Sequence, residues 1–88
     1  MLEIEWTETA IKSLERLDNR QIEEIRAKFD EVAEEKFSHD DIKPIKDRGK
    51  WIWRLKVKEE NTDHRIFIDL IDTNLVILEI AHRDNAYQ

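Results

Sequence analysis

The strongest constraint on the fold is a series of three strand-like segments in the C-terminal half, separated by short polar turns. In the first, WIWRLKVK at 51–58, basic residues alternate with apolar ones. The segments RIFIDLI at 65–71 and LVILEIA at 75–81 follow the turns EENTDH and DTN. Side chains of a β-strand point alternately to the two faces of a sheet. We therefore predict three consecutive strands that pair as an antiparallel meander.

The N-terminal half has the periodicity of helices. Residues 2–6, LEIEW, alternate as in a short, half-buried strand. Thr7 is a favourable N-cap, and apolar residues then recur at helical spacing in 10–17 and again in 21–37. The segment LDNR between them contains residues that favour turns and caps. This pattern predicts two helices joined as a hairpin.

The order of these elements defines a fold class. Residues 42–50, IKPIKDRGK, contain the only proline and the only glycine of the chain and are predicted to be a connector. The predicted order is β-α-α-β-β-β, a single α+β domain over 1–88 whose antiparallel sheet packs on an N-terminal helical hairpin. The opposite face of the sheet would carry four basic side chains, those of Arg54, Lys56, Lys58 and Arg65.

The composition argues against several classes of protein. No apolar run approaches the roughly 18–20 residues needed to cross a bilayer. The first ten residues lack the basic and apolar regions of a signal peptide. The absence of cysteine fits a reducing compartment. We therefore predict a cytoplasmic protein without a membrane partner.

Charge is distributed unevenly along the chain, whose net charge is −6. Residues 1–41 hold 6 Lys/Arg and 13 Asp/Glu, a net of −7, and residues 42–88 have a net of +1. Within 43–58 there are 7 basic residues and 1 acidic residue, a net of +6. Such asymmetry is typical of nucleic-acid contact. A strand edge decorated with lysine, which prevents sheets from associating, is the structural alternative.

The sequence contains no pattern typical of a metal centre or of a nucleophile. The three histidines, His39, His64 and His82, are scattered, so we predict no metal site and no cofactor. Cysteine is absent, and no serine is placed beside a base. The carboxylates of 23–35 interleave with basic residues at helical spacing, which is typical of a salt-bridged helix surface.

The basic strand face and the C-terminal tail together carry the side chains that metal-free RNA cleavage needs. Attack by an internal 2′-hydroxyl requires a base, an acid for the leaving 5′-oxygen, and cations that stabilise a phosphorane-like transition state. An aromatic ring can stack on a splayed base. Arginine suits the phosphate because its planar fork binds two oxygens at once. The tail supplies three further candidates, His82, Arg83 and Tyr87.

Each candidate also has a purely structural explanation. Arg54 and Lys56 can be the polar side of an outer strand, and Arg65 can pair with Asp69 or Glu79. Tyr87 can pack the chain terminus against the sheet. Residue types and spacing alone leave both explanations open.

Over nearly its whole length the sequence resembles the RelE/ParE toxin superfamily, and more closely its RelE-like branch of messenger-RNA interferases. IEWTETAIKSLERLD is similar to the opening strand and helix of that family. IKPIKDRGKWIWRLKV is similar to its connector and WRL-type strand. DHRIFIDLIDTNLVILEIAHRDNAY is similar to the segment with a Tyr-Arg pair, a hairpin and a closing His-Arg followed by Tyr.

The resemblance implies the toxin component of a type II toxin–antitoxin system. It implies a metal-independent endoribonuclease, without cofactor, that cuts messenger RNA on the ribosome by 2′-hydroxyl attack. It also implies a cognate antitoxin that wraps and neutralises the toxin, with operator DNA contacted only through that antitoxin.

By position, the resemblance implies a role for each candidate residue. Arg65 corresponds to the arginine that stabilises the transition state, and Arg83 to the tail arginine at the scissile phosphate. Tyr87 corresponds to the tail tyrosine that orients the nucleophile or stacks on a base, and His82 to a histidine sometimes offered as acid or base. The RNA-binding candidates are Lys50, Arg54, Lys56 and Lys58.

Several features depart from the family pattern. His64 stands where the family usually has tyrosine, and the turn KEENTDH is longer than usual, which would shift Arg65 relative to Arg54. The chain is acidic, whereas ribosome-targeting toxins are commonly basic. Two alternatives follow, a ParE-like toxin that inhibits DNA gyrase by binding, and an inactive relative that serves as an antitoxin-binding module.

Overall fold

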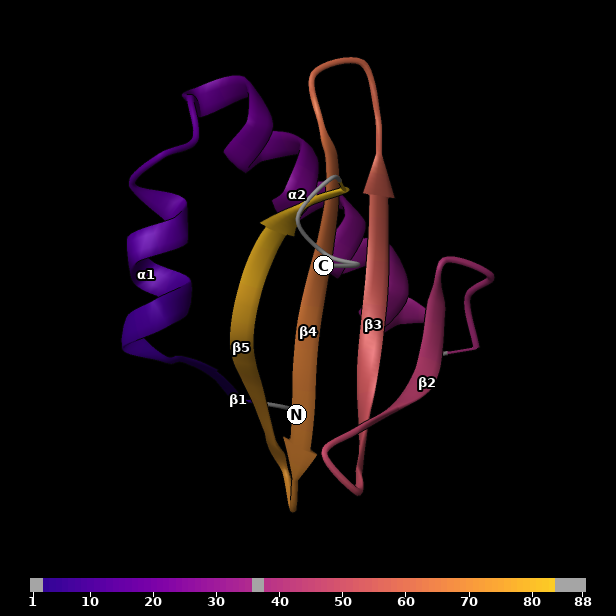
Figure 1. Ribbon diagram of the computed structural model, residues 1–88. Coiled ribbons are helices and arrows are strands. Elements are labelled where there is room, and N and C mark those ends of the chain that lie inside the picture. The colour runs from indigo at the N-terminus through magenta and orange to yellow at the C-terminus, as the bar shows by residue number, and fades with distance from the viewer. Residues whose placement is uncertain (1–2, 36–37, 84–88) are drawn as a thin grey trace.

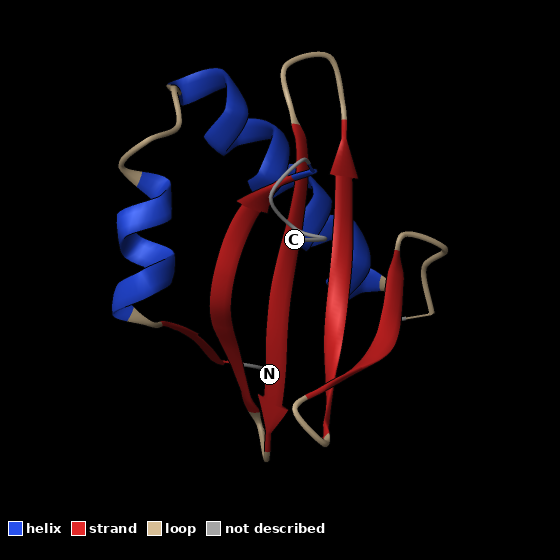
Figure 2. Ribbon diagram, in the orientation of Figure 1, coloured by secondary structure: helices blue, strands red, loops and turns tan. Residues whose placement is uncertain are grey.

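The fold is α+β, as the sequence predicts, with two helices against one face of a five-stranded sheet (Figures 1 and 2). The structure is a computed structural model, and it describes residues 3–35 and 38–83. In Figure 1, α2 crosses behind the sheet and α1 lies along the β5 side. The elements in chain order are β1 (Glu3–Trp6), α1 (Glu8–Leu14), α2 (Asn19–Glu34), β2 (Ile42–Asp47), β3 (Lys50–Lys58), β4 (Asp63–Ile71) and β5 (Asn74–His82).

The strand order across the sheet is β1-β5-β4-β3-β2. β3, β4 and β5 form the predicted antiparallel meander. β1 pairs with β5 in parallel, so the sheet is mixed rather than wholly antiparallel. A register shift between Phe67 and Ile68 marks a bulge in the pairing of β4 with β5. A bulge of this kind bends the strand and increases its twist.

The prediction that residues 42–50 form a connector is wrong, because most of this segment is strand β2. It pairs antiparallel with β3, from Ile42 opposite Leu55 to Asp47 opposite Lys50. Pro44 is compatible with this strand because β2 is at the edge of the sheet, where one side of the backbone needs no partner. The turn to β3 uses Arg48 and Gly49, both with positive φ, of 53° and 81°.

Both helices begin at the caps that the sequence indicates. The Thr7 hydroxyl accepts a hydrogen bond from the Ala10 amide at 3.1 Å and donates to the Ile77 carbonyl at 2.8 Å, which ties the start of α1 to β5. Asp18 and Gln21 form a reciprocal capping box at the start of α2. The predicted end of the second helix at Phe37 lies outside the described residues. No helix of the described chain is long and apolar enough to cross a membrane.

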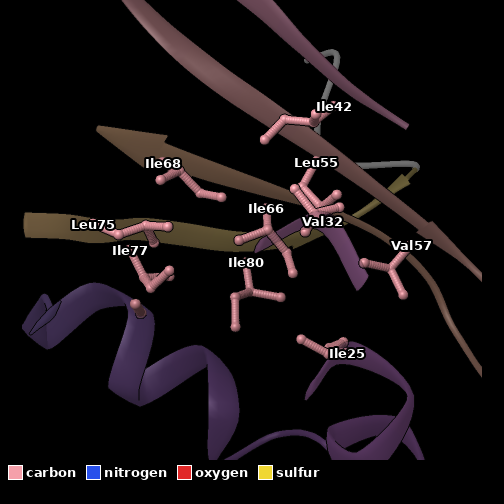
Figure 3. Packing of buried hydrophobic residues seen from close by; sticks show 11 residues of the cluster. Ile25, Val32, Ile42, Leu55, Val57, Ile66, Ile68, Leu75, Ile77 and Ile80 are labelled. Atoms are coloured by element: carbon pink, nitrogen blue, oxygen red, sulfur yellow. The ribbon is translucent and has the colours of Figure 1, made fainter. Parts of the chain in front are cut away.

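The core lies between the helices and the sheet face that the alternation predicts (Figure 3). Its completely buried strand residues are Leu55, Val57, Ile66, Ile68 and Ile77. Ala10, Ile25 and Val32 cover them from the helices. The prediction that the first strand is half-buried is wrong, since Ile4 is 53% exposed in an edge strand.

Candidate nucleic-acid interface

The sheet face opposite α2, which no helix of the described chain covers, carries the predicted basic side chains. We call it the open face. Lys56 of β3 lies directly opposite Arg65 of β4, and Arg54 lies opposite Phe67. In an antiparallel pair, opposed residues project from the same face, and residues two apart in a strand do so as well. The fold therefore brings Arg54, Lys56 and Arg65 together, as the alternation predicts.

Arg65 is held in place by its own strand. Its side chain is only 7% exposed, and Nη1 donates to Asp63 Oδ1 and to the His64 carbonyl, each at 3.2 Å. The guanidinium therefore pairs with Asp63, a carboxylate that the sequence analysis does not offer as its partner. Such pairing orients the arginine but also offsets part of its charge.

The carboxylate of Asp63 lies close to several cations. Burial tends to raise its pKa, but the hydrogen bond from Arg65 and the charges of Arg65, Arg83 and Lys58 outweigh burial and hold the pKa below its usual range. Arg83 follows directly after β5 and is exposed. Arg83 and Lys58 therefore lie close enough to this carboxylate to influence it. We call the set Arg54, Lys56, Lys58, Arg65 and Arg83 the cation cluster.

Lys50 does not belong to the cation cluster. It lies six residues before Lys56 on β3, which at about 3.3 Å per residue separates the two by roughly 20 Å. At that end of the sheet its ammonium donates to Asp69, whose side chain is almost buried. Lys50 is therefore the RNA-binding candidate with the weakest geometric support.

His82 is also separated from the cation cluster. It lies opposite His64, while its neighbour Ala81 lies opposite Arg65, so both histidines belong to the helix-side face. The two rings meet edge to face, with centroids 5.3 Å apart. Burial, and then the neighbouring His82, lower the pKa of His64, and Asp63 opposes this effect. The candidate Tyr87 lies outside the described residues.

Sequence reasoning missed how the long β3–β4 turn is fixed to α2. Glu24 accepts hydrogen bonds from the Asn61 amide at 3.0 Å and from the Thr62 hydroxyl at 3.1 Å. Gln21 donates to the Asn61 carbonyl at 3.0 Å. These contacts hold a turn after which Asp63 lies opposite Lys58, so Arg65 stays in register with Lys56. A polar face on α2 was visible in the sequence, but its partner was not.

A groove of about 590 Å³ runs beside the cation cluster on the open face. Ile52 and Phe67 form part of its floor, and residues 45–48 at the end of β2 form a wall. Glu79, opposite Phe67 on β5, also lines it. The sequence did not reveal this groove because residues 42–50 were predicted as connector.

The arrangement is suited to binding a polyanion along one face. The five cations come from β3, β4 and the start of the tail, three of them lie near the Asp63 carboxylate, and an aromatic ring lies next to them. Among the described residues no group of three or more His, Cys, Asp or Glu side chains is placed to hold a metal ion. Arginine and lysine are side chains suited to binding phosphate.

Comparisons with known proteins place the chain in a family. Residues 4–87 match the model of the ParE toxin of the type II toxin–antitoxin system parDE. No curated protein matches the sequence significantly.

Solved structures have the same fold. A chain of the RelBE2 toxin–antitoxin complex from Mycobacterium tuberculosis is 22% identical, with 93% of this chain and 98% of that chain covered and a TM-score of 0.69. For the archaeal RelE–RelB complex from Pyrococcus horikoshii the identity is 17%, the coverage 97% and 98%, and the TM-score 0.70. For the RelB–RelE complex from Methanococcus jannaschii the identity is 17%, the coverage 94% of each chain, and the TM-score 0.63. The chain belongs to the ParE toxin family of type II toxin–antitoxin systems, within the RelE/ParE superfamily.

Proposed function

We propose that this toxin is a metal-independent endoribonuclease that cleaves messenger RNA, on the ribosome and in the cytoplasm, by attack of an internal 2′-hydroxyl. The observation that supports the proposal is the cation cluster, five basic side chains on the open face, of which Lys58, Arg65 and Arg83 lie close enough to influence the Asp63 carboxylate. The scissile phosphate gains negative charge in the transition state, and fixed cations stabilise that charge.

In this proposal Arg65 and Arg83 bind the scissile phosphate. The phosphates on either side of it along the RNA are bound by Arg54, Lys56 and Lys58. A guanidinium has five N–H donors, so an arginine already held by Asp63 can also donate to a phosphate. Tyr87 stacks on a base or orients the nucleophile. His82 packs against His64 on the helix side, and we assign it to positioning the start of the tail rather than to proton transfer. Lys50 contributes at most a contact to the RNA backbone far from the scissile phosphate.

We further propose a cognate antitoxin as protein partner, with operator DNA contacted only through it. The solved structures that share this fold include toxin–antitoxin complexes. Exposed apolar side chains support such a partner. Ile4 is 53% exposed and Trp51 is 65% exposed, and both lie on the helix-side face beyond the cover of the helices. Apolar surface of this kind is typical of a protein interface.

A gyrase-inhibiting toxin is the second candidate. The matching family is that of ParE toxins, and the pairing of Arg65 with Asp63 offsets part of the charge that catalysis would use. A toxin that acts by binding alone needs no transition-state cations. The third possibility, an inactive relative that binds an antitoxin, requires neither activity.

Induced expression separates these functions. We expect the wild type to stop growth and to cut a reporter transcript at codon-phased positions, mapped by primer extension. Arg83→Ala should reduce cleavage by about 10²–10³-fold, the typical cost of removing one transition-state donor. Arg65→Ala should do the same, with circular dichroism as a check because Arg65 is buried. Arg26→Ala, which removes an exposed cation from α2, is the matched control and should cleave normally.

Two other outcomes contradict the nuclease proposal. Growth arrest with intact transcripts and induction of the DNA-damage response would support gyrase inhibition. Normal growth with intact transcripts at high protein levels would support the antitoxin-binding module.

A further inference from the structure

The two histidines on the helix-side face form a pair to which the proposed RNA cleavage assigns no proton transfer. His64 and His82 are direct cross-strand partners at the end where β5 extends beyond β1. Both line a cavity of about 290 Å³ between β5 and the helices, together with Ser13, Arg16, Gln21 and Glu79. The charges of Arg16 and Glu79 in this lining balance each other, so the formal charge of the cavity lining is near zero. The cavity is large enough for an ion with several water molecules.

His64 also carries a buried nitrogen without a partner. The residue is only 6% exposed, and no hydrogen-bond partner for Nδ1 is found among the described residues. Buried polar atoms are rarely left in this state, and a bound ion or an ordered water is the usual explanation.

The separation of the rings fits a shared ion. Zinc binds imidazole nitrogen at about 2.0–2.1 Å with tetrahedral angles, which places the centres of two coordinating rings roughly 5 Å apart. The observed centroids are 5.3 Å apart.

We propose that His64 and His82 form a two-imidazole site for a borderline divalent cation such as Zn²⁺ or Ni²⁺. Because no three-ligand group of His, Cys, Asp or Glu is present in the described part of the chain, water completes the coordination. Nitrogen ligands select Zn²⁺ and Ni²⁺ over Mg²⁺ and Ca²⁺, which prefer oxygen. The bound ion joins β4 to the end of β5 and so fixes the residue that precedes Arg83. Binding of the ion can be tested whether or not the protein cleaves RNA.

The alternative location is His39, the third histidine. Its ring lies 2.8 Å from Glu31 and within 4 Å of Glu35 and Asp41. Lys28, however, already contacts Glu31 and Asp41 at 3.0 and 3.1 Å. An ammonium in that position supplies the positive charge that a metal ion would otherwise bring. We therefore place the ion at His64 and His82.

Isothermal titration of the purified, untagged protein with ZnCl₂ and NiCl₂ tests the site. We expect one ion per chain for the wild type, and no binding of Mg²⁺. His82→Asn removes an exposed ligand with little risk to the fold and should weaken binding tenfold or more, while His39→Asn should leave it unchanged. Histidine NMR signals should shift at His64 and His82 but not at His39.

Three results would overturn the proposal. These are no heat and no NMR shift with the wild type, equal affinity in His82→Asn, or loss of binding in His39→Asn. In the first case an ordered water is the partner of His64 Nδ1. His64→Tyr, checked by circular dichroism, gives a second test, since a folded variant that still binds the ion with full affinity excludes His64 as a ligand.

Discussion

Lys28 and Arg65 are two nearly buried basic side chains with opposite surroundings. Lys28, 12% exposed, contacts three carboxylates, those of Glu31, Asp41 and Glu59, at 3.0, 3.1 and 3.5 Å. Arg65 pairs with the carboxylate of Asp63, which is itself influenced by Arg83 and Lys58. In the first network acids outnumber the base, and in the second bases outnumber the acid.

The difference separates a structural network from a binding surface. Although burial tends to lower the pKa of Lys28, its hydrogen bonds to Glu31 and Asp41 raise it well above the usual range. That lysine stays charged and joins α2 to the 38–41 loop and to the β3–β4 turn. Around Asp63 the excess is positive, and an excess of positive charge on an open face attracts anions. A chain with a net charge of −6 can therefore still present a cationic surface.

Removal of Lys28 should have the largest effect on stability. Lys28→Ala leaves three carboxylates facing one another without a cation, and we expect the free energy of unfolding to fall by about 1–3 kcal/mol. The carboxylates are partly exposed, which keeps the effect at this level. Urea denaturation measures it, with Lys12→Ala as control, because the Lys12–Glu8 pair is mostly exposed and should contribute less than about 0.5 kcal/mol. Equal midpoints for the two variants would contradict the structural role of Lys28.

Removal of the single carboxylate should strengthen the cation cluster. In Asp63→Asn, Arg65 loses its acidic partner and becomes available for one more phosphate contact. We expect tighter binding of a short single-stranded RNA and a log–log salt dependence that is steeper by about 0.7. Fluorescence anisotropy at several salt concentrations measures both, and Asp30→Asn on the exposed surface of α2 is the control for net charge. If both variants gain equally, overall charge rather than the cation cluster governs binding.

The smallest predicted effect is a change of stability with pH. It comes from protonation of His64, which lies between Asp63 and Arg65 in the chain. Its pKa is lower in the folded protein than the usual value of about 6.5. The unfolded chain therefore binds more protons in this range, so stability is complete above pH 6.5 and falls as the pH drops towards the folded-state pKa.

We expect the melting temperature in metal-free buffer to decrease between pH 7 and pH 5. His64→Tyr should flatten the decrease, because it removes both the titrating ring and the charge that faces His82. A profile identical to that of the wild type would show that other groups set the pH dependence. The shifts of Asp63 and Glu31 are both downward from ordinary carboxyl values, so these groups titrate below this range.

Sequence reasoning identified the parts of the fold that have a simple period. The alternation in 51–58 places Leu55 and Val57 in the core and Arg54 and Lys56 on the opposite face, as observed. Thr7 caps the first helix as predicted. These results depend on rules that operate within a few residues.

The errors occur where pairing with a distant strand decides the outcome. Pro44 suggested a connector, but β3 provides a partner for an edge strand at 42–47. β1 alternates like a half-buried strand, yet its position at the other edge leaves Ile4 exposed. Whether a strand is central, at the edge or covered by a helix is a property of the whole sheet.

The candidate site shows the same division. Spacing within β3 correctly groups Arg54 with Lys56, but it cannot reveal that Lys50 pairs with Asp69 at the far end. The step from Ala81 to His82 turns the histidine away from Arg65, because adjacent residues of a strand face opposite sides. The sequence contains the three histidines as scattered residues, and only strand pairing brings two of them together.

The sequence alone thus determined the family, the order of most elements and the basic face, because local periodicity and motif order are written along the chain. The tertiary structure decided which charges are balanced. It joined Lys28 to three acids from separate segments and surrounded Asp63 with cations from β3, β4 and the start of the tail. Electrostatic interaction depends on distance in space, and residues far apart in the chain become neighbours only when the sheet forms.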